Sequence, residues 1–106
     1  MIYELREYVA APGAADRLHA RFADHTLDLF ARHGLTVAGF WTDAEDSSTI
    51  RYLLRFADEA ARKDAWAAFQ ADPDWQAVKA ESERDGAIVA EMRSHVLVDV
   101  PYWSPR

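Results

Sequence analysis

The sequence predicts an α+β domain on the ferredoxin-like split βαβ plan, in which a four-stranded antiparallel sheet carries its helices on one face. Two observations lead to this fold class. Stretches of alternating apolar and polar residues are typical of strands, and longer stretches with a period of three and four residues are typical of helices. Along the chain these stretches follow the order β-α-β-β-α-(α)-β. With 106 residues, half of them apolar, the chain is long enough for one core, so we expect a single domain over residues 1–106.

The N-terminal half is expected to hold three strands and one long helix. We place the first strand at residues 1–9 (MIYELREYV) and the helix at residues 13–34, with Gly34 as a left-handed C-terminal cap. Two strands follow at residues 35–42 (LTVAGFWT) and 50–56 (IRYLLRF). The polar segment DAEDSST between them is predicted to form the hairpin loop.

The C-terminal half is expected to hold two helices and a long strand. Asp58 is placed to cap a helix that runs to about Ala71. The sequence Asp72-Pro73-Asp74 ends that helix and starts a shorter one at residues 75–84. A fourth strand follows at residues 87–100, and the remaining tail is expected to be extended.

A histidine lies within the apolar stripe of the first helix. Leu18, Phe22, His25 and Leu29 are spaced by four, three and four residues, which is the period of a helix face packed against a core. The charged residues of this helix, Arg21 among them, follow the same period on the opposite side. We therefore expect His25 to face inward and Arg21 to face solvent.

An inward-facing imidazole has two interpretations. In the first, His25 is a core residue whose ring nitrogens are satisfied by a tyrosine hydroxyl or a backbone carbonyl. In the second, His25 is a catalytic acid or base at the mouth of a pocket between this helix and the sheet. Tyr3, Trp41 and Tyr52 would then bind the substrate as walls of that pocket.

The sheet face turned away from the helices is predicted to carry charged and apolar residues together. Its charged members are Glu4, Arg6, Arg55, Glu91, Arg93 and His95. Such a face is too charged for a core and too apolar for an open surface. Two copies packed sheet to sheet would bury the apolar residues and pair the charges. We therefore expect a homodimer, with these residues as a network across its interface.

Composition excludes several classes of function. The chain has no cysteine, which excludes disulfides and thiolate chemistry, and its net charge of −6 argues against binding to nucleic acid or to an anionic membrane. No apolar run approaches the roughly 20 residues that span a bilayer. The sequence opens directly as a strand without a leader, so the expected location is the cytoplasm. His25 and His33 are too far apart to share an ion, and nothing indicates a haem pocket, so we expect no metal and no cofactor.

Five motifs together resemble the NIPSNAP family in their order and spacing. They are Ile2-Tyr3-Glu4-Leu5-Arg6, His25-Thr26-Leu27 with Phe30-Ala31-Arg32-His33-Gly34, Val37-Ala38-Gly39-Phe40-Trp41, Asp72-Pro73-Asp74-Trp75 and Tyr102-Trp103-Ser104-Pro105. The resemblance covers nearly the whole chain. It implies a dimeric α+β barrel, the superfamily fold shared with small antibiotic-biosynthesis monooxygenases, haem-degrading enzymes and stress-response barrels. It implies no particular reaction.

Two functions are consistent with the sequence. The first is a small cofactor-free enzyme or binder, of monooxygenase, isomerase or cyclase type, that acts on a compact apolar or aromatic metabolite, with His25 carrying the proton. The second is a non-catalytic homodimeric binding or scaffold module in which His25 is structural. A cavity beside His25 with room for a ligand would favour the first.

Overall fold

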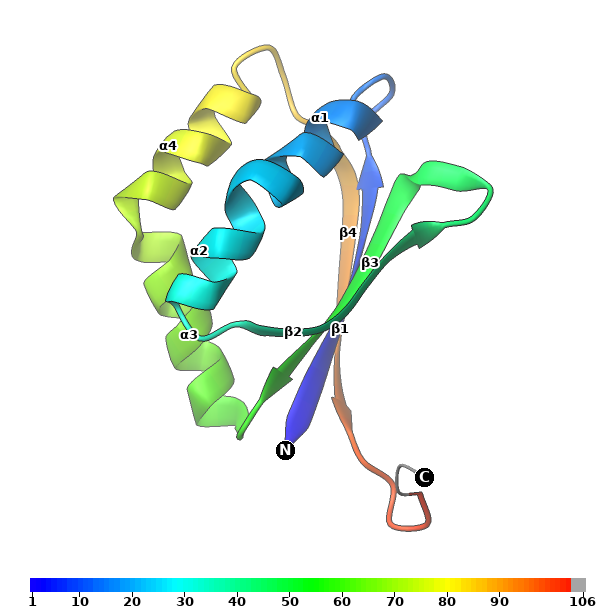
Figure 1. Cartoon of the computed structure of the whole chain (residues 1–106), viewed down its shortest axis with the longest axis vertical. Coiled ribbons are helices and arrows are strands. Elements are labelled where there is room, and N and C mark those ends of the chain that lie inside the picture. The colour runs from blue at the N-terminus through cyan, green and yellow to red at the C-terminus, as the bar shows by residue number, and fades with distance from the viewer. Residues whose placement is uncertain (104–106) are drawn as a thin grey trace.

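One four-stranded antiparallel sheet carries all the helices on one of its faces (Figure 1). The computed structural model describes residues 1–103, so the Ser104-Pro105 part of the closing motif lies outside the described residues. The elements are β1 (Ile2–Ala10), α1 (Ala15–Arg21), η1 (Phe22–Thr26), α2 (Leu27–Arg32), β2 (Thr36–Asp43), β3 (Asp46–Phe56), α3 (Glu59–Ala71), α4 (Pro73–Ser82) and β4 (Val89–Val98). The predicted α+β fold class is confirmed.

The strands lie in the order β2-β3-β1-β4, so β1 is central and β4 forms one edge. The hairpin between β2 and β3 is tighter than predicted, because β3 begins at Asp46 rather than at Ile50. Polar residues can extend a strand where their side chains face solvent, and the Thr42 hydroxyl also donates a hydrogen bond of 2.8 Å to the carbonyl of Thr49. The predicted loop is therefore mostly strand.

The predicted helix ends are confirmed where they depend on local chemistry. The Asp58 carboxylate accepts a hydrogen bond of 2.8 Å from the backbone N–H of Ala61 at the start of α3. The Asp72 carboxylate does the same for the N–H of Asp74 at 2.8 Å, with a proline in the first turn of α4. Gly34 follows α2 with a φ of 78°, a conformation that glycine adopts without strain.

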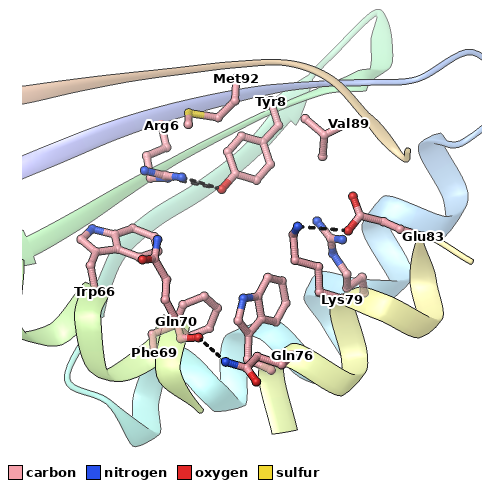
Figure 2. Close-up of a pocket in the computed structure, with 12 residues that line it drawn as sticks. Arg6, Tyr8, Trp66, Phe69, Gln70, Gln76, Lys79, Glu83, Val89 and Met92 are labelled. Carbon is pink, nitrogen blue, oxygen red and sulfur yellow. Dashed lines mark hydrogen bonds and ion pairs between the residues drawn. The ribbon is translucent and has the colours of Figure 1, made fainter. Parts of the chain in front are cut away.

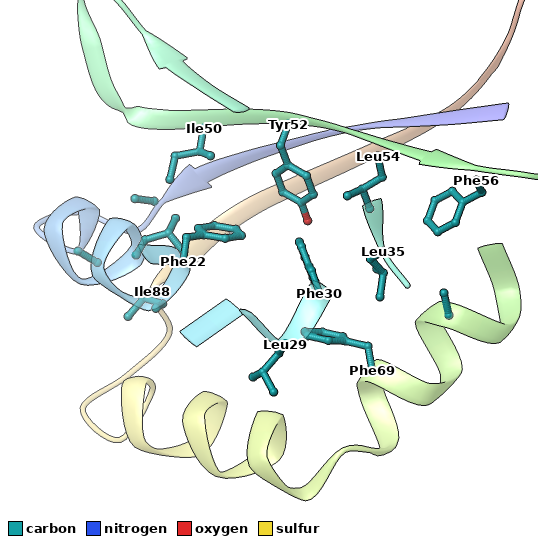
Figure 3. Close-up of a cluster of buried hydrophobic side chains, with 14 residues drawn as sticks. Phe22, Leu29, Phe30, Leu35, Ile50, Tyr52, Leu54, Phe56, Phe69 and Ile88 are labelled. Carbon is teal, nitrogen blue, oxygen red and sulfur yellow. The ribbon is translucent and has the colours of Figure 1, made fainter. Parts of the chain in front are cut away.

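Aromatic side chains fill the space between the sheet and the helices (Figure 3). Tyr52 of β3 is fully buried at the centre of this core, stacked on Phe40 with ring centroids 5.1 Å apart. Phe30 of α2 packs 5.7 Å from Tyr52 and 5.0 Å from Phe69 of α3. These contacts tie both helical segments to the middle of the sheet.

The first helix contains a π-helical turn, and this turn overturns the predicted position of His25. In η1 the backbone N–H of Leu27 donates a hydrogen bond to the carbonyl of Phe22. The Thr26 hydroxyl donates a hydrogen bond of 3.1 Å to the carbonyl of Arg21. The turn holds one residue more than an α-helical turn, so Thr26 takes the buried position below Phe22. His25 is exposed, and the expectation that it faces inward is wrong.

The expected solvent position of Arg21 is also wrong. Arg21 ends α1 immediately before the π-helical turn and is only 7% exposed. Its side chain packs toward α4, where it donates a hydrogen bond of 3.2 Å to the hydroxyl of Ser82. Arg21 is therefore a buried charged residue, although the helical spacing of the charged residues predicted that it would face solvent.

The two faces of β1 are the reverse of those predicted. Glu4 is 1% exposed and accepts a hydrogen bond from Trp66 of α3, so Glu4 and its strand neighbour Arg6 face the helices. Tyr3, expected on the helix side, lies opposite Arg55 on the outer face. Polarity misled the prediction, because buried charges are tolerated where hydrogen bonds satisfy them.

The outer sheet face keeps four of the six charged residues assigned to it. Arg55, Glu91, Arg93 and His95 are exposed and lie opposite outer-face residues of β1. Glu4 and Arg6 do not belong to this face, so the predicted network across it loses both. The outer face still mixes these charges with apolar side chains such as Leu97, which is 40% exposed.

Candidate functional site

A cleft of about 400 Å³ opens between strands β1 and β4 of the sheet and helices α3 and α4 (Figure 2). Arg6, Tyr8 and Met92 project into it from the sheet and face Trp66 and Lys79 on the helices. The topology explains the opening. Strand β4 lies at the sheet edge beyond the cover of the helices, and Met92 on its helix side stays 51% exposed.

Arg6 is the polar centre of the cleft wall. Its guanidinium donates hydrogen bonds of 2.9 Å to the hydroxyl of Tyr52, 2.9 Å to the hydroxyl of Tyr8 and 2.8 Å to the carboxylate of Glu4. Its Cζ lies 4.4 Å from the ring centroid of Trp66, within cation–π range. Contacts on every side hold the charge in one place, which is the condition for electrostatic preorganisation.

Glu4 anchors this arrangement from behind. Its carboxylate accepts hydrogen bonds from Ser94 at 2.6 Å, Trp66 at 2.8 Å, Arg6 at 2.8 Å and Arg62 at 3.0 Å. Burial alone would raise the pKa of Glu4, but these four donors outweigh it, so the pKa lies below its ordinary value. Glu4 is therefore an ionised, fully engaged positioning residue rather than a free base.

The hydroxyls of Tyr8 and Tyr52 lie 3.0 Å apart, and both accept from Arg6. Burial raises the pKa of Tyr52 well above its ordinary value, so Tyr52 keeps its proton. Tyr52 is fully buried, and a buried O–H needs an acceptor, which Tyr8 provides. Tyr8 lines the cleft, so its hydroxyl is the member of this pair that a bound molecule can reach.

None of the four predicted catalytic and substrate-binding residues lines this cleft. Tyr52 comes nearest, because it lies fully buried behind the wall and its hydroxyl contacts Arg6 and Tyr8. Tyr3 lies on the outer sheet face. Trp41 is 54% exposed there, with its ring lying over Gly39, so its predicted place as a pocket wall is wrong. His25 instead lines two open hollows on the other side of α4, one of about 280 Å³ shared with α1 and one of about 410 Å³ shared with α2. Its acid–base role therefore stays a prediction that this cleft does not support.

Sequence reasoning missed the roles of Arg6, Tyr8 and Trp66. One signal was present: Glu4, Arg6 and Tyr8 alternate along β1 and so share a face. A carboxylate, a guanidinium and a phenol in a row on one strand face can form hydrogen bonds with one another, which makes their burial in a core possible. The partner residues on α3 and β4 were not visible as partners, because they are far away in the sequence.

Among residues 1–103, no group of three or more histidine, aspartate or glutamate side chains is arranged to hold a metal ion. Within the same part of the chain, no helix combines the length and the apolar character needed to cross a lipid bilayer.

The fold and the cleft define a small α+β protein of the ferredoxin-like class, with a polar cluster at the wall of a partly aromatic cleft. The sequence model of the NIPSNAP family matches residues 3–105, and the chain belongs to the NIPSNAP family. The family resemblance seen in the sequence is thereby confirmed. No match to the chain is found among curated proteins.

Solved structures with the same fold are similar over nearly the whole chain. An uncharacterised NIPSNAP domain protein from Burkholderia xenovorans superposes with a TM-score of 0.82 at 20% identity, covering 99% of this chain and 100% of that chain. A NIPSNAP family protein from Agrobacterium tumefaciens gives 0.84 at 15% identity, with 99% and 98% covered. A structure described as an antibiotic biosynthesis monooxygenase gives 0.65 at 14% identity, with 95% and 100% covered. These likenesses show the fold.

Proposed function

We propose that the protein binds a compact, planar, apolar or aromatic molecule in the cleft between β1, β4, α3 and α4, and stabilises negative charge on an oxygen of that molecule. The observation that carries the proposal is the Tyr8 hydroxyl on the wall of an open cleft, 2.9 Å from the fixed charge of Arg6 and 3.0 Å from the hydroxyl of Tyr52. This cleft replaces the pocket beside His25 that the sequence favoured.

The chemistry follows from the order of the hydrogen bonds. Arg6 and Tyr52 both donate to the Tyr8 oxygen, so each draws electron density from it and strengthens Tyr8 as a donor. A ligand oxygen at Tyr8 would receive its proton, or a strong hydrogen bond, as that oxygen becomes negative. Enolates and phenolates are stabilised in this way. An activity without a cofactor, of isomerase or monooxygenase type, would begin from such an oxyanion.

The rest of the cleft suits an aromatic ligand. Trp66, Phe69 and Trp75 supply rings from the helices, and Val89 and Met92 supply aliphatic surface from the sheet side. A volume of about 400 Å³ lies within the roughly 300–1,000 Å³ of ordinary small-molecule pockets. The described structural relative named as an antibiotic biosynthesis monooxygenase is consistent with this ligand class, by analogy of fold alone.

2-Naphthol tests the proposal without knowledge of the substrate, because its ionisation can be followed by absorbance. We expect it to bind in the cleft and shift the indole N–H signals of Trp66 and Trp75 in an NMR titration. The pKa of bound 2-naphthol should fall by about one to two units, since a hydrogen bond to a charged group contributes about 1.5–3 kcal/mol. Tyr8→Phe should remove most of that shift, whereas Trp41→Phe on the outer face should not.

Two results would contradict the proposal. If 2-naphthol leaves the indole signals unmoved, the cleft is not a site for planar aromatic molecules, and the non-catalytic module becomes the better reading. If it binds with an unchanged pKa, or if Tyr8→Phe has no effect, the polar cluster does not stabilise an oxyanion.

For assembly, we propose that two copies pair through the outer sheet face. This face combines half-buried apolar residues such as Leu5 and Leu53 with exposed Leu97, and it has charged residues of both signs around them. Burying it against a second copy would remove apolar surface from water and allow the charges to pair across a two-fold axis. Light scattering should give twice the chain mass of 12.0 kDa, and a monomer at micromolar concentration would refute the pairing.

A further inference from the structure

Arg21 lines the same cleft as Arg6 but comes from the end of α1, directly before the π-helical turn, where it also borders a hollow beside His25. Its Cζ lies 5.2 Å from the ring centroid of Trp75, and its Nη1 donates to the Ser82 hydroxyl at 3.2 Å. Arg21 is only 7% exposed, so solvent reaches little of it. Arginine is seldom buried to this degree without a charged partner.

Within the described residues, Arg21 has no such partner. Its Nε is buried and makes no hydrogen bond, and no carboxylate lies within ion-pair distance of its guanidinium. Burial lowers the pKa of Arg21, and the attraction of Glu83 and of two tyrosines does not make up for it. Arg6, by comparison, is paired with Glu4 at 2.8 Å.

The other charges of the cleft are already matched. Glu83 lies 3.4 Å from Lys79, and Glu4 neutralises Arg6. One positive charge is therefore left over in the cleft, on Arg21. A carboxylate on a bound molecule would supply the charged partner that Arg21 lacks, since a guanidinium and a carboxylate match in planar, forked geometry.

We propose that Arg21 binds a carboxylate of the ligand, so that the substrates of this cleft are aryl or enol carboxylates that place an oxygen at Tyr8 and an anionic group at Arg21. This inference rests on the proposed function and adds the chemical class of the substrate. It also assigns the π-helical turn a purpose, because the turn accompanies the burial of Arg21 beside the cleft.

Matched pairs of probes test the carboxylate separately from the ring. The probes are 4-hydroxybenzoate, 4-hydroxycinnamate and 6-hydroxy-2-naphthoate, each compared with its carboxamide, so that three spacings between hydroxyl and carboxylate are covered. In at least one pair, calorimetry or NMR titration should show the carboxylate binding about tenfold more tightly than the carboxamide. Arg21→Met should abolish this preference and leave the affinity for the carboxamide unchanged.

Arg17→Met is the matched control, because Arg17 lies on the same helix, is exposed and does not line the cleft. It removes the same charge and should keep the preference. Arg21→Lys retains a charge without the planar fork and should lose most of the preference, which provides a second variant if the methionine variant folds poorly. Without ligand, Arg21→Met should melt at the same or a higher temperature than the wild type, since it relieves an unpaired buried cation.

The possible failures are distinct. If wild type binds carboxylates and carboxamides equally while the Tyr8-dependent effect on 2-naphthol persists, the carboxylate subsite is refuted and the proposed function stands. A clear loss of melting temperature in Arg21→Met, together with an unchanged preference, would show that Arg21 is structural. If neither 2-naphthol nor any of these probes binds, both proposals fall; if only 2-naphthol binds, the carboxylate subsite alone is refuted.

Discussion

Replacing Glu4 by glutamine turns one carboxylate oxygen into an amide nitrogen inside the polar cluster, where all four neighbours donate hydrogen bonds. Oε1 accepts from Arg62 and Trp66, and Oε2 accepts from Arg6 and Ser94. An amide nitrogen in place of Oε1 would face two donors that cannot accept. In place of Oε2 it would face Arg6, whereas the Ser94 hydroxyl can rotate and accept.

The better-tolerated orientation of Glu4→Gln therefore still loses the bond to Arg6 and leaves buried positive charge without its carboxylate. Breaking a buried ion pair costs about 3–5 kcal/mol, and we expect a loss near the lower end, about 3 kcal/mol, because one rotamer keeps three of the four contacts. For a domain of this size that corresponds to a fall in melting temperature of about 12–24 °C. Thermal or urea unfolding followed by circular dichroism measures it.

The matched control is Glu7→Gln on the same strand. Glu7 lies on the outer face and pairs with Arg51 at 2.8 Å, with its side chain 24% exposed and that of Arg51 40% exposed. A pair that open to solvent contributes about 0–1 kcal/mol, so the control should change stability little. If Glu4→Gln destabilises no more than Glu7→Gln does, the cluster is not a buried ionic centre.

Acid unfolding provides an independent measurement on Glu4. The folded-state pKa of Glu4 lies below its ordinary value of 4.5, so the ionised group stabilises the fold fully above that value. This contribution is lost as the pH falls through the lower folded-state pKa, because the folded protein must then take up a proton that the unfolded chain already holds. Stability of the Glu4→Gln variant should therefore vary less with pH below 4.5 than that of the wild type.

Three further variants test local features. Thr26→Val should lower the stability by about 1–2 kcal/mol, measured by urea unfolding, because it removes a buried hydroxyl that donates to a backbone carbonyl of the π-helical turn; an unchanged midpoint would show that this bond does not hold the turn. Gly39→Ala should displace the Trp41 ring, since a Cβ at residue 39 would overlap it, and the tryptophan fluorescence should change; an identical spectrum would contradict that packing. The hydrogen bond with His33 lowers the pKa of Asp72 to about 2, so its carboxyl carbon should titrate near that value by NMR, with the stability it provides lost as the pH falls from about 4 toward 2; Asp72→Asn should lack this loss.

The order of strands and helices and the family could be predicted from the sequence, because these features depend on signals that are local along the chain. Asp58 and Asp72 cap their helices with side chains two or three residues from the N–H groups they accept from, and Gly34 adopts its positive φ at the residue itself. Strand alternation and helical periods likewise need only neighbouring residues.

The helix phase could not be predicted in the same way. The spacing of Leu18, Phe22 and Leu29 is consistent with a continuous α-helix, and on that assumption His25 faces inward. One π-helical turn buries Thr26 instead and exposes His25, and Arg21 beside it is buried as well. Nothing in the local pattern marks the extra residue in that turn, because the packing of the helix against the sheet and α4 stabilises it.

The candidate site itself was decided only by the tertiary structure. Taken alone, Glu4 and Arg6 are charged residues on a strand, and the sequence predicts that they face solvent, because burying a charge without partners costs free energy. Their burial becomes favourable because Trp66, some sixty residues along the chain, and Ser94, some ninety residues along it, donate hydrogen bonds directly to the Glu4 carboxylate. The sequence by itself determined which residues carry charge on β1, whereas long-range partners determined that this charge lies inside, where the low dielectric gives it its chemical strength.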